Sequence, residues 1–276
     1  MQVLKKIFSG FVLIFYCSNL PAQVDTIMYQ RDSAVMTDTD LTTLFFQQGG
    51  KAANPSKLVL VMKANKSINL TAFLKNLGIY TDHVLADLDN DGKKELIVSN
   101  YTGGAHCCDE IYIFKNIAPN RYQYVVKFFA GNTTITANNE FVYNFYEQFG
   151  YFFTCYACAY TDTTDEAPVK LQNIILKYNK GKVTVVPGDK ELRSTIIDNL
   201  GKLGEQPYEK LENASSFDNG LRKEFAINLS VFYYSFGRNM TETQKLFNKY
   251  YKLPDAKKVW TTFAKDLLNI KKQSDF

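Results

Sequence analysis

Four carboxylates and a glycine lie within nine residues of this chain, at a spacing that could hold a metal ion. Asp87, Asp89 and Asp91 alternate with single residues, Gly92 follows, and Glu95 stands at the ninth place. Carboxylates two residues apart in a tight loop converge on one point, and glycine adopts backbone conformations that a side chain resists. Clustered carboxylates repel one another unless a cation lies among them, and hard oxygen donors suit Ca²⁺. The spacing therefore predicts a calcium loop.

The flanking residues decide which kind of loop this is. Short apolar runs at residues 84–86 and 96–98 predict a strand on each side. An EF-hand needs helices there and a glutamate at the twelfth loop position, which is Val98 in this chain. An acidic turn that binds nothing is the alternative, because Asp and Gly suit turns and two lysines follow the glycine.

Set between two strands, this pattern resembles the calcium loop of the FG-GAP/VCBS family. The next residues, TGGAHCC at 102–108, resemble a tag found in bacterial secreted members with a single copy of the loop. The resemblance covers residues 80–115 and leaves most of the chain outside it. It implies that the ion orders the loop and does no chemistry. The implied ligands are the side chains of Asp87, Asp89, Asp91 and Glu95 and the backbone carbonyl of Lys93.

The N-terminus predicts export. Lys5 and Lys6 precede an apolar run at residues 7–16, and small residues follow at 20–23. This pattern is typical of a signal peptide cleaved after residue 22, and the run is too short for a membrane span. The mature protein is therefore expected to be periplasmic or secreted. Anchoring as a lipoprotein through Cys17 is disfavoured, because the preceding residues are bulky.

Charge and composition limit the class of partner. Removal of residues 1–22 takes away two lysines and no acid, so the net charge of +4 falls to about +2. This balance gives no electrostatic reason to bind nucleic acid or an anionic membrane. No later segment is apolar enough to cross a membrane. The expected partner is an unidentified glycan or protein at the cell surface.

Four cysteines remain after cleavage, and an even number in an exported protein predicts disulfides. Cys107 and Cys108 are adjacent, and Cys155 and Cys158 are three residues apart. On an extended strand both arrangements point the two side chains to opposite faces. The sequence therefore predicts two bridges that join one pair to the other. Either pairing satisfies this geometry.

The same cysteines allow a soft-metal alternative. Together with His106 they offer enough ligands for tetrahedral zinc, provided that both segments turn sharply. A thioredoxin-like role for Cys155 and Cys158 is weaker, because the flanking residues look extended rather than helical. An oxidising compartment disfavours free thiolates, so zinc is the less favoured cofactor and Ca²⁺ the favoured one.

Periodicity predicts an α+β fold with a division near residue 188. Residues 23–188 are expected to form an antiparallel β-rich, FG-GAP/VCBS-like domain that contains the calcium-loop hairpin. Within it, residues 70–77 carry a helical stripe, residues 151–156 read as a strand, and residues 179–181 read as a hairpin turn. From residue 189 to 276 apolar residues recur at helical spacing and predict a helical region. A single calcium loop does not support a closed propeller.

Three functions follow from these features. The favoured one is a calcium-binding, non-catalytic module at the cell envelope. The first alternative is a thiol or metal sensor built on His106, Cys107, Cys108, Cys155 and Cys158. The second is a secreted hydrolase with paired carboxylates, which leave little signature in a sequence. The chain has only two histidines and no GxSxG, HExxH or phosphate-loop motif, which argues against an enzyme.

Overall fold

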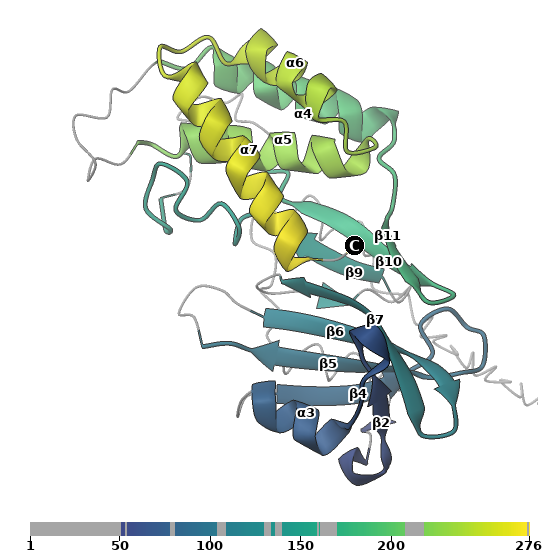
Figure 1. Ribbon diagram of the computed structural model, residues 1–276. Helices are drawn as coiled ribbons and strands as arrows, with labels where there is room; N and C mark the ends of the chain where they lie inside the picture. The colour runs from purple at the N-terminus through teal and green to yellow at the C-terminus, as the bar shows by residue number, and fades with distance from the viewer. Residues whose placement is uncertain are drawn as a thin grey trace, which may run out of the picture.

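The computed structural model describes residues 51–52, 54–77, 81–103, 109–129, 134–135, 140–158, 160, 170–207, 218–274 and 276. Strands dominate the first part of the described chain and four long helices follow them (Figure 1). The predicted α+β class is confirmed. The division at residue 188 stays a prediction, because one hydrophobic cluster runs from the strands into the helices.

Sheet A contains the first strands of the described chain. Its order is β1-β4-β5-β6-β7-β2-β3, and the pairs are antiparallel except for the parallel pair of β2 and β7. The predicted strands on both sides of the acidic loop are β4 and β5, the second and third strands from the β1 edge of this sheet. The bounds are β1 Lys51–Ala52, β2 Val59–Val61, β3 Ser67–Asn69, β4 Thr81–Ala86, β5 Glu95–Tyr101, β6 Asp109–Ala118 and β7 Arg121–Phe129.

Sheet B is a smaller antiparallel sheet with the order β11-β10-β9-β8. Its bounds are β8 Thr134–Ile135, β9 Glu140–Asn144, β10 Asn173–Asn179 and β11 Lys182–Val185. Lys180 and Gly181 connect β10 to β11 with φ values of 49° and 83°. Two central residues with positive φ are typical of the tight hairpin turn that matches strand twist. The predicted hairpin is therefore confirmed.

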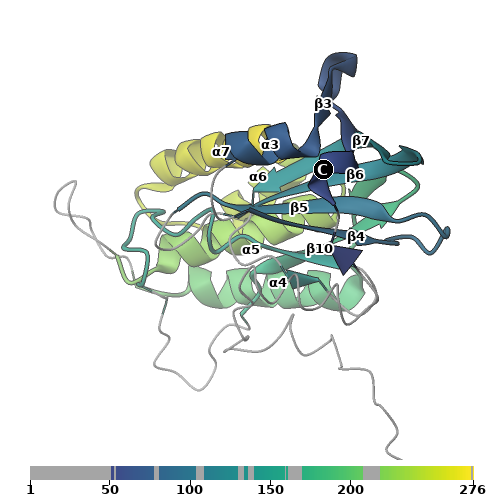
Figure 2. The same cartoon turned by 90° about the horizontal axis from the view of Figure 1, so that it is seen from below.

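Alternation along β5 explains how sheet A is covered on both faces. Leu96 and Val98 pack with Phe73 of helix α3 (Leu70–Leu77), whose bounds coincide with the predicted helical stripe. Ile97 points the other way, into a cluster shared with sheet B and the C-terminal helices. Figure 1 shows the resulting order of α4–α7, sheet B, sheet A and α3, and Figure 2 views it from the α3 side. Loop side chains next to β5 can therefore reach sheet B.

Four helices follow sheet B in the described chain: α4 (Lys190–Gly204), α5 (Leu221–Ser235), α6 (Met240–Tyr250) and α7 (Ala256–Gln273). Asp189 and Asn239 cap α4 and α6 through hydrogen bonds from backbone amides to their side chains. Among the described helices, none combines the length and the apolar character that a bilayer crossing requires.

Helix α5 is buried along nearly its whole length and carries an ion-paired network. The guanidinium of Arg222, 2% exposed, donates to Asp218 Oδ2 at 2.7 Å and to Asp255 Oδ2 at 2.8 Å. Asp218 precedes α5 and Asp255 precedes α7. The network therefore joins the starts of the two helices, and the buried charge of Arg222 is compensated.

One expectation about an aromatic-rich segment is wrong. Residues 151–156 form turns and bends instead of a strand. This run buries Phe152 against Phe149 without a ladder of strand hydrogen bonds, so aromatic content alone misled the prediction. Tyr234 and Tyr251 are buried in the main core, where α5 and α6 pack with α4 and α7.

Candidate metal centre

The predicted metal loop, residues 87–94, connects β4 to β5. The strand register pairs Ala86 with Glu95, so the hairpin closes directly beneath the loop. Within the loop, Asn90 and Gly92 have φ values of 57° and 84°. Glycine and asparagine tolerate this left-handed region best, which explains why they stand at these places. The chain therefore turns sharply enough to gather several aspartates.

Backbone amides of the loop hold two of the aspartates. The amides of Asp91 and Gly92 donate to the two carboxylate oxygens of Asp87 at 3.1 and 2.9 Å. The amide of Lys93 donates to Asp91 Oδ1 at 2.8 Å. These charge-assisted hydrogen bonds fix the loop backbone.

Glu95 points into the protein. Strand alternation puts it on the same face of β5 as Ile97, which packs toward sheet B, and its side chain is 2% exposed. The amide of Leu88 donates to Glu95 Oε2 at 3.2 Å, and the hydroxyl of Tyr178 on β10 donates to Oε1 at 3.2 Å. Glu95 therefore contacts both the loop and the second sheet.

This environment disfavours the ionised form of Glu95. Burial raises the pKa of its carboxyl group to about 7, and the nearby charges of Asp89 and Asp91 also raise it, while the hydrogen bonds from Leu88 and Tyr178 oppose the rise. Desolvation and like charge both penalise a carboxylate, and a bound cation relieves both penalties.

Asp89 has one buried carboxylate oxygen that accepts no hydrogen bond within the described part of the chain. Its Oδ2 accepts a hydrogen bond of 2.6 Å from the amide of Lys180, in the turn between β10 and β11. Its Oδ1 is buried, and among the described residues no donor reaches it. A buried oxygen without a partner is costly, because it has lost water and gained nothing in return. A cation at Oδ1 would compensate that loss.

Three of the predicted carboxylates converge. Asp87, Asp89 and Glu95 each offer an oxygen, and these oxygens lie within 4.8 Å of one another. Asp91 is not part of this group, and its Oδ1 already accepts the hydrogen bond from Lys93. The role of the Lys93 carbonyl stays a prediction. An all-oxygen set of carboxylates with one unsatisfied buried oxygen is compatible with Ca²⁺.

Sequence reasoning missed the second half of this site. Tyr178 and Lys180 belong to the β10–β11 hairpin, yet their hydrogen bonds reach Glu95 and Asp89. The hairpin turn was visible in the sequence, but nothing near it indicates which loop it contacts. Only the stacking of sheet B on sheet A brings the two together.

The cysteine prediction needs correction. His106, Cys107 and Cys108 lie outside the described residues. Cys155 and Cys158 form a disulfide with each other, with an S–S distance of 1.97 Å, so the expected bridges between the two pairs are wrong for these two residues. The reason is local: residues 155–158 form a turn, in which side chains three residues apart can meet. While this bond exists, neither sulfur is a thiolate that could bind zinc.

Comparison with known proteins adds no assignment. No protein-family model, no curated protein and no solved structure matched this chain. Membership of residues 80–115 in the FG-GAP/VCBS group therefore stays a prediction.

Proposed function

We propose that this protein is an extracytoplasmic calcium-binding module without catalytic activity, with a structural or binding role at the cell envelope. One Ca²⁺ would be held by Asp87, Asp89 and Glu95. The single observation that carries this proposal is the buried, unpartnered Oδ1 of Asp89, whose carboxylate belongs to the same cluster as Glu95.

The surroundings of the cluster favour a structural role for the ion. Both Asp89 and Glu95 are hydrogen-bonded to the β10–β11 hairpin, through Lys180 and Tyr178. An ion held by these carboxylates would therefore strengthen the contact between sheet A and sheet B, and not only order the loop. Such an ion stabilises the native state in proportion to its binding free energy.

The extracytoplasmic location rests on two supports. The first 22 residues have the pattern of a signal peptide, although they lie outside the described residues. The Cys155–Cys158 bond is typical of an oxidising compartment. Extracellular calcium modules bind their ion with dissociation constants of about 10⁻⁴–10⁻³ M, since calcium is abundant there.

Calorimetric titration tests the proposal. The protein, stripped with EDTA and dialysed, is titrated with CaCl₂ and in parallel with MgCl₂. We expect one Ca²⁺ per chain with a Kd of about 10⁻⁴–10⁻³ M and weaker binding of Mg²⁺, which demands stricter geometry. Asp89→Asn keeps the shape of the side chain and removes its charge, so it should weaken Ca²⁺ binding at least about tenfold.

The matched control is Asp198→Asn, which removes one exposed carboxylate from helix α4, outside the cluster. It should leave the Kd unchanged. If the unmodified protein binds no Ca²⁺ at about 5 mM, or if both variants weaken binding equally, the cluster is an acidic turn and the proposal is wrong.

A further inference from the structure

A second candidate site lies in a hollow that shares no residue with the metal cluster. The hollow lies between the turns at residues 147–153 and helix α7 and has a volume of about 380 Å³, which is the size of a small-ligand pocket. Its lining combines aromatic rings with charged and neutral polar groups. The lining residues are Glu147, Gln148, Gly150, Tyr151, Phe152, Phe153, Lys258, Thr262 and Asp266.

An exposed aromatic ring stands at this hollow. Tyr151 is 71% exposed, whereas its neighbour Phe152 is buried and packs on Phe149. The packing of Phe152 holds the backbone of the turn in place, so the position of the Tyr151 ring is restricted. The exposed face of the Tyr151 ring is therefore accessible to a ligand in the hollow.

The ring of Tyr151 is also supported from the side. Its centroid lies 5.5 Å from that of Tyr156, whose hydroxyl donates to Glu147 in the lining. Gly150 permits this packing, because a Cβ at that place would lie 2.3 Å from the Tyr156 ring. Tyr156 thus positions one aromatic and one acidic residue of the hollow.

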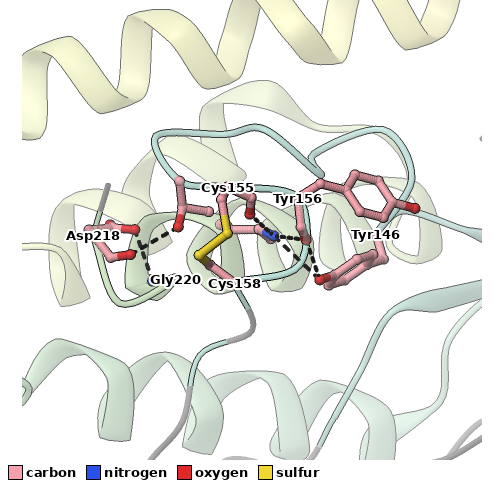
Figure 3. The surroundings of a disulfide bond; sticks show 8 residues. Tyr146, Cys155, Tyr156, Cys158, Asp218 and Gly220 are labelled. Carbon is pink, nitrogen blue, oxygen red and sulfur yellow. Dashed lines mark hydrogen bonds between the residues drawn. A yellow bond between two sulfur atoms is a disulfide. The ribbon is translucent and has the colours of Figure 1, made fainter. Parts of the chain in front are cut away.

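The disulfide in turn fixes Tyr156, as Figure 3 shows. Tyr156 lies inside the loop closed by Cys155 and Cys158. The buried ammonium group of Lys223 on α5 donates to the carbonyls of Cys155 and Tyr156 at 3.0 and 2.9 Å. The hydroxyl of Tyr146 donates to the same Tyr156 carbonyl at 2.7 Å. The hollow is therefore preorganised, which reduces the entropy lost on binding.

The lining carries hydrogen-bonding groups that suit a ligand with many hydroxyl groups. Glu147 and Asp266 bring two carboxylates, and Lys258 brings one ammonium group, which lies 5.3 Å from the ring centroid of Phe153. The net negative charge of these three groups disfavours an anionic ligand. Carboxylates accept hydrogen bonds from hydroxyls, and a flat aromatic face stacks on the C–H face of a sugar ring.

A second hollow of about 460 Å³ adjoins the first along α7. The two share Lys258 and Thr262, and the second extends to the turn at Pro254 and Asp255. A ligand longer than one ring could therefore continue from one hollow into the next.

We propose that these hollows form a binding site for a short neutral oligosaccharide. One sugar ring stacks on Tyr151, and its hydroxyls donate to the carboxylates of Glu147 and Asp266. The adjoining hollow beside Lys258 takes the next sugar. This inference goes beyond the calcium module and does not depend on it, because the two sites have no residue in common.

The test is calorimetric titration of the oxidised protein with cellotetraose, maltotetraose and chitotetraose, each with EDTA and with CaCl₂. We expect at least one of the three to bind with a Kd of about 0.1–1 mM, with or without calcium. Tyr151→Ala and Asp266→Asn should each weaken that binding about tenfold. Leu268→Ala is the matched control, since Leu268 is 54% exposed on the same helix and lines neither hollow.

A double variant tests the positioning role of the disulfide. Cys155→Ser with Cys158→Ser should weaken oligosaccharide binding and leave calcium binding unchanged. The inference is overturned if none of the three probes binds at about 10 mM, or if Tyr151→Ala and the control affect binding equally. It is also overturned if only an anionic probe, tetragalacturonate, binds. A cooperative thermal unfolding transition in the same samples shows that the protein is folded and that the failure belongs to this site alone.

Discussion

The buried carboxyl group of Glu95 predicts that the metal-free protein loses stability as the pH rises toward neutrality. Its pKa is raised from the ordinary 4.5 to about 7 in the folded protein. Between these two values the folded state therefore holds a proton that the unfolded state has released. The slope of the unfolding free energy with pH follows the difference in bound protons, and here it is negative. The contribution of the Glu95 carboxyl group to the unfolding free energy is fully present below pH 4.5 and is lost as the pH rises through 7.

The magnitude follows from the pKa difference. At about 1.4 kcal/mol per pH unit, the change from 4.5 to about 7 corresponds to a loss on the order of 3 kcal/mol from Glu95. Glu224 on α5 has its pKa raised to about 7 by burial as well, so it adds a loss of the same sign in the same pH range. The two contributions differ in one respect: only Glu95 belongs to the metal cluster.

Calcium separates the two contributions. A bound cation favours the ionised form of Glu95, so saturating Ca²⁺ should remove its share of the pH dependence and leave that of Glu224. The assay is urea unfolding at pH 5, 6, 7 and 8, with EDTA or with CaCl₂. The difference between the two curves should grow with pH by up to about 3 kcal/mol.

Two variants complete this experiment. Glu95→Gln should reduce the slope of the pH profile in EDTA and remove most of the calcium effect, while Glu224→Gln should reduce the slope by a similar amount and keep the calcium effect. If the stability in EDTA is constant or rises from pH 5 to 7, Glu95 is not protonated in the folded state and the reasoning fails. An unchanged calcium effect in Glu95→Gln would refute its role as a ligand.

Three further substitutions test the packing around the two sites. Tyr178→Phe removes the hydroxyl that donates to the buried glutamate, and it should lower the unfolding free energy in EDTA by about 1–3 kcal/mol, measured by urea unfolding; no change would mean that this hydrogen bond contributes nothing. Arg222→Met leaves Asp218 as an unpaired buried charge and should cost about 3–5 kcal/mol by the same measurement, and a loss below about 1 kcal/mol would contradict the buried network. Gly150→Ala places a methyl group against the Tyr156 ring and should lower Tm by several degrees, whereas an unchanged Tm in calorimetry would show that this turn is loosely packed.

Much of the fold could be predicted because its signals are local. The helix at Leu70–Leu77 and the hairpin at residues 179–181 follow from the spacing of apolar residues and from turn-forming residues next to them. The turns at residues 151–156 could not be predicted in this way. Aromatic residues favour strands and irregular cores alike, and only the packing of Phe152 against Phe149 shows which applies.

The candidate metal centre was predictable to the extent that it is local. Asp87, Asp89 and Glu95 lie within nine residues of the chain, and their spacing alone indicates a shared cation. Tyr178 and Lys180 could not be found, because their contacts to Glu95 and Asp89 span 83 and 91 residues. The prediction of the disulfide pairing failed for the opposite reason. Cys155 and Cys158 are only three residues apart, and on the strand assumed there their side chains would point to opposite faces. The structure has a turn at this place, in which the two side chains can meet.

These long contacts have a consequence for the order of folding. The hairpins of β5, β6 and β7 join neighbouring segments and can form early, because short loops lose little entropy on closure. The surroundings of Glu95 and Asp89 are complete only after the β10–β11 hairpin has docked, more than eighty residues later in the chain. An ion can bind there only after most of the native structure has formed. Calcium would therefore mainly lower the unfolding rate and have little effect on the folding rate.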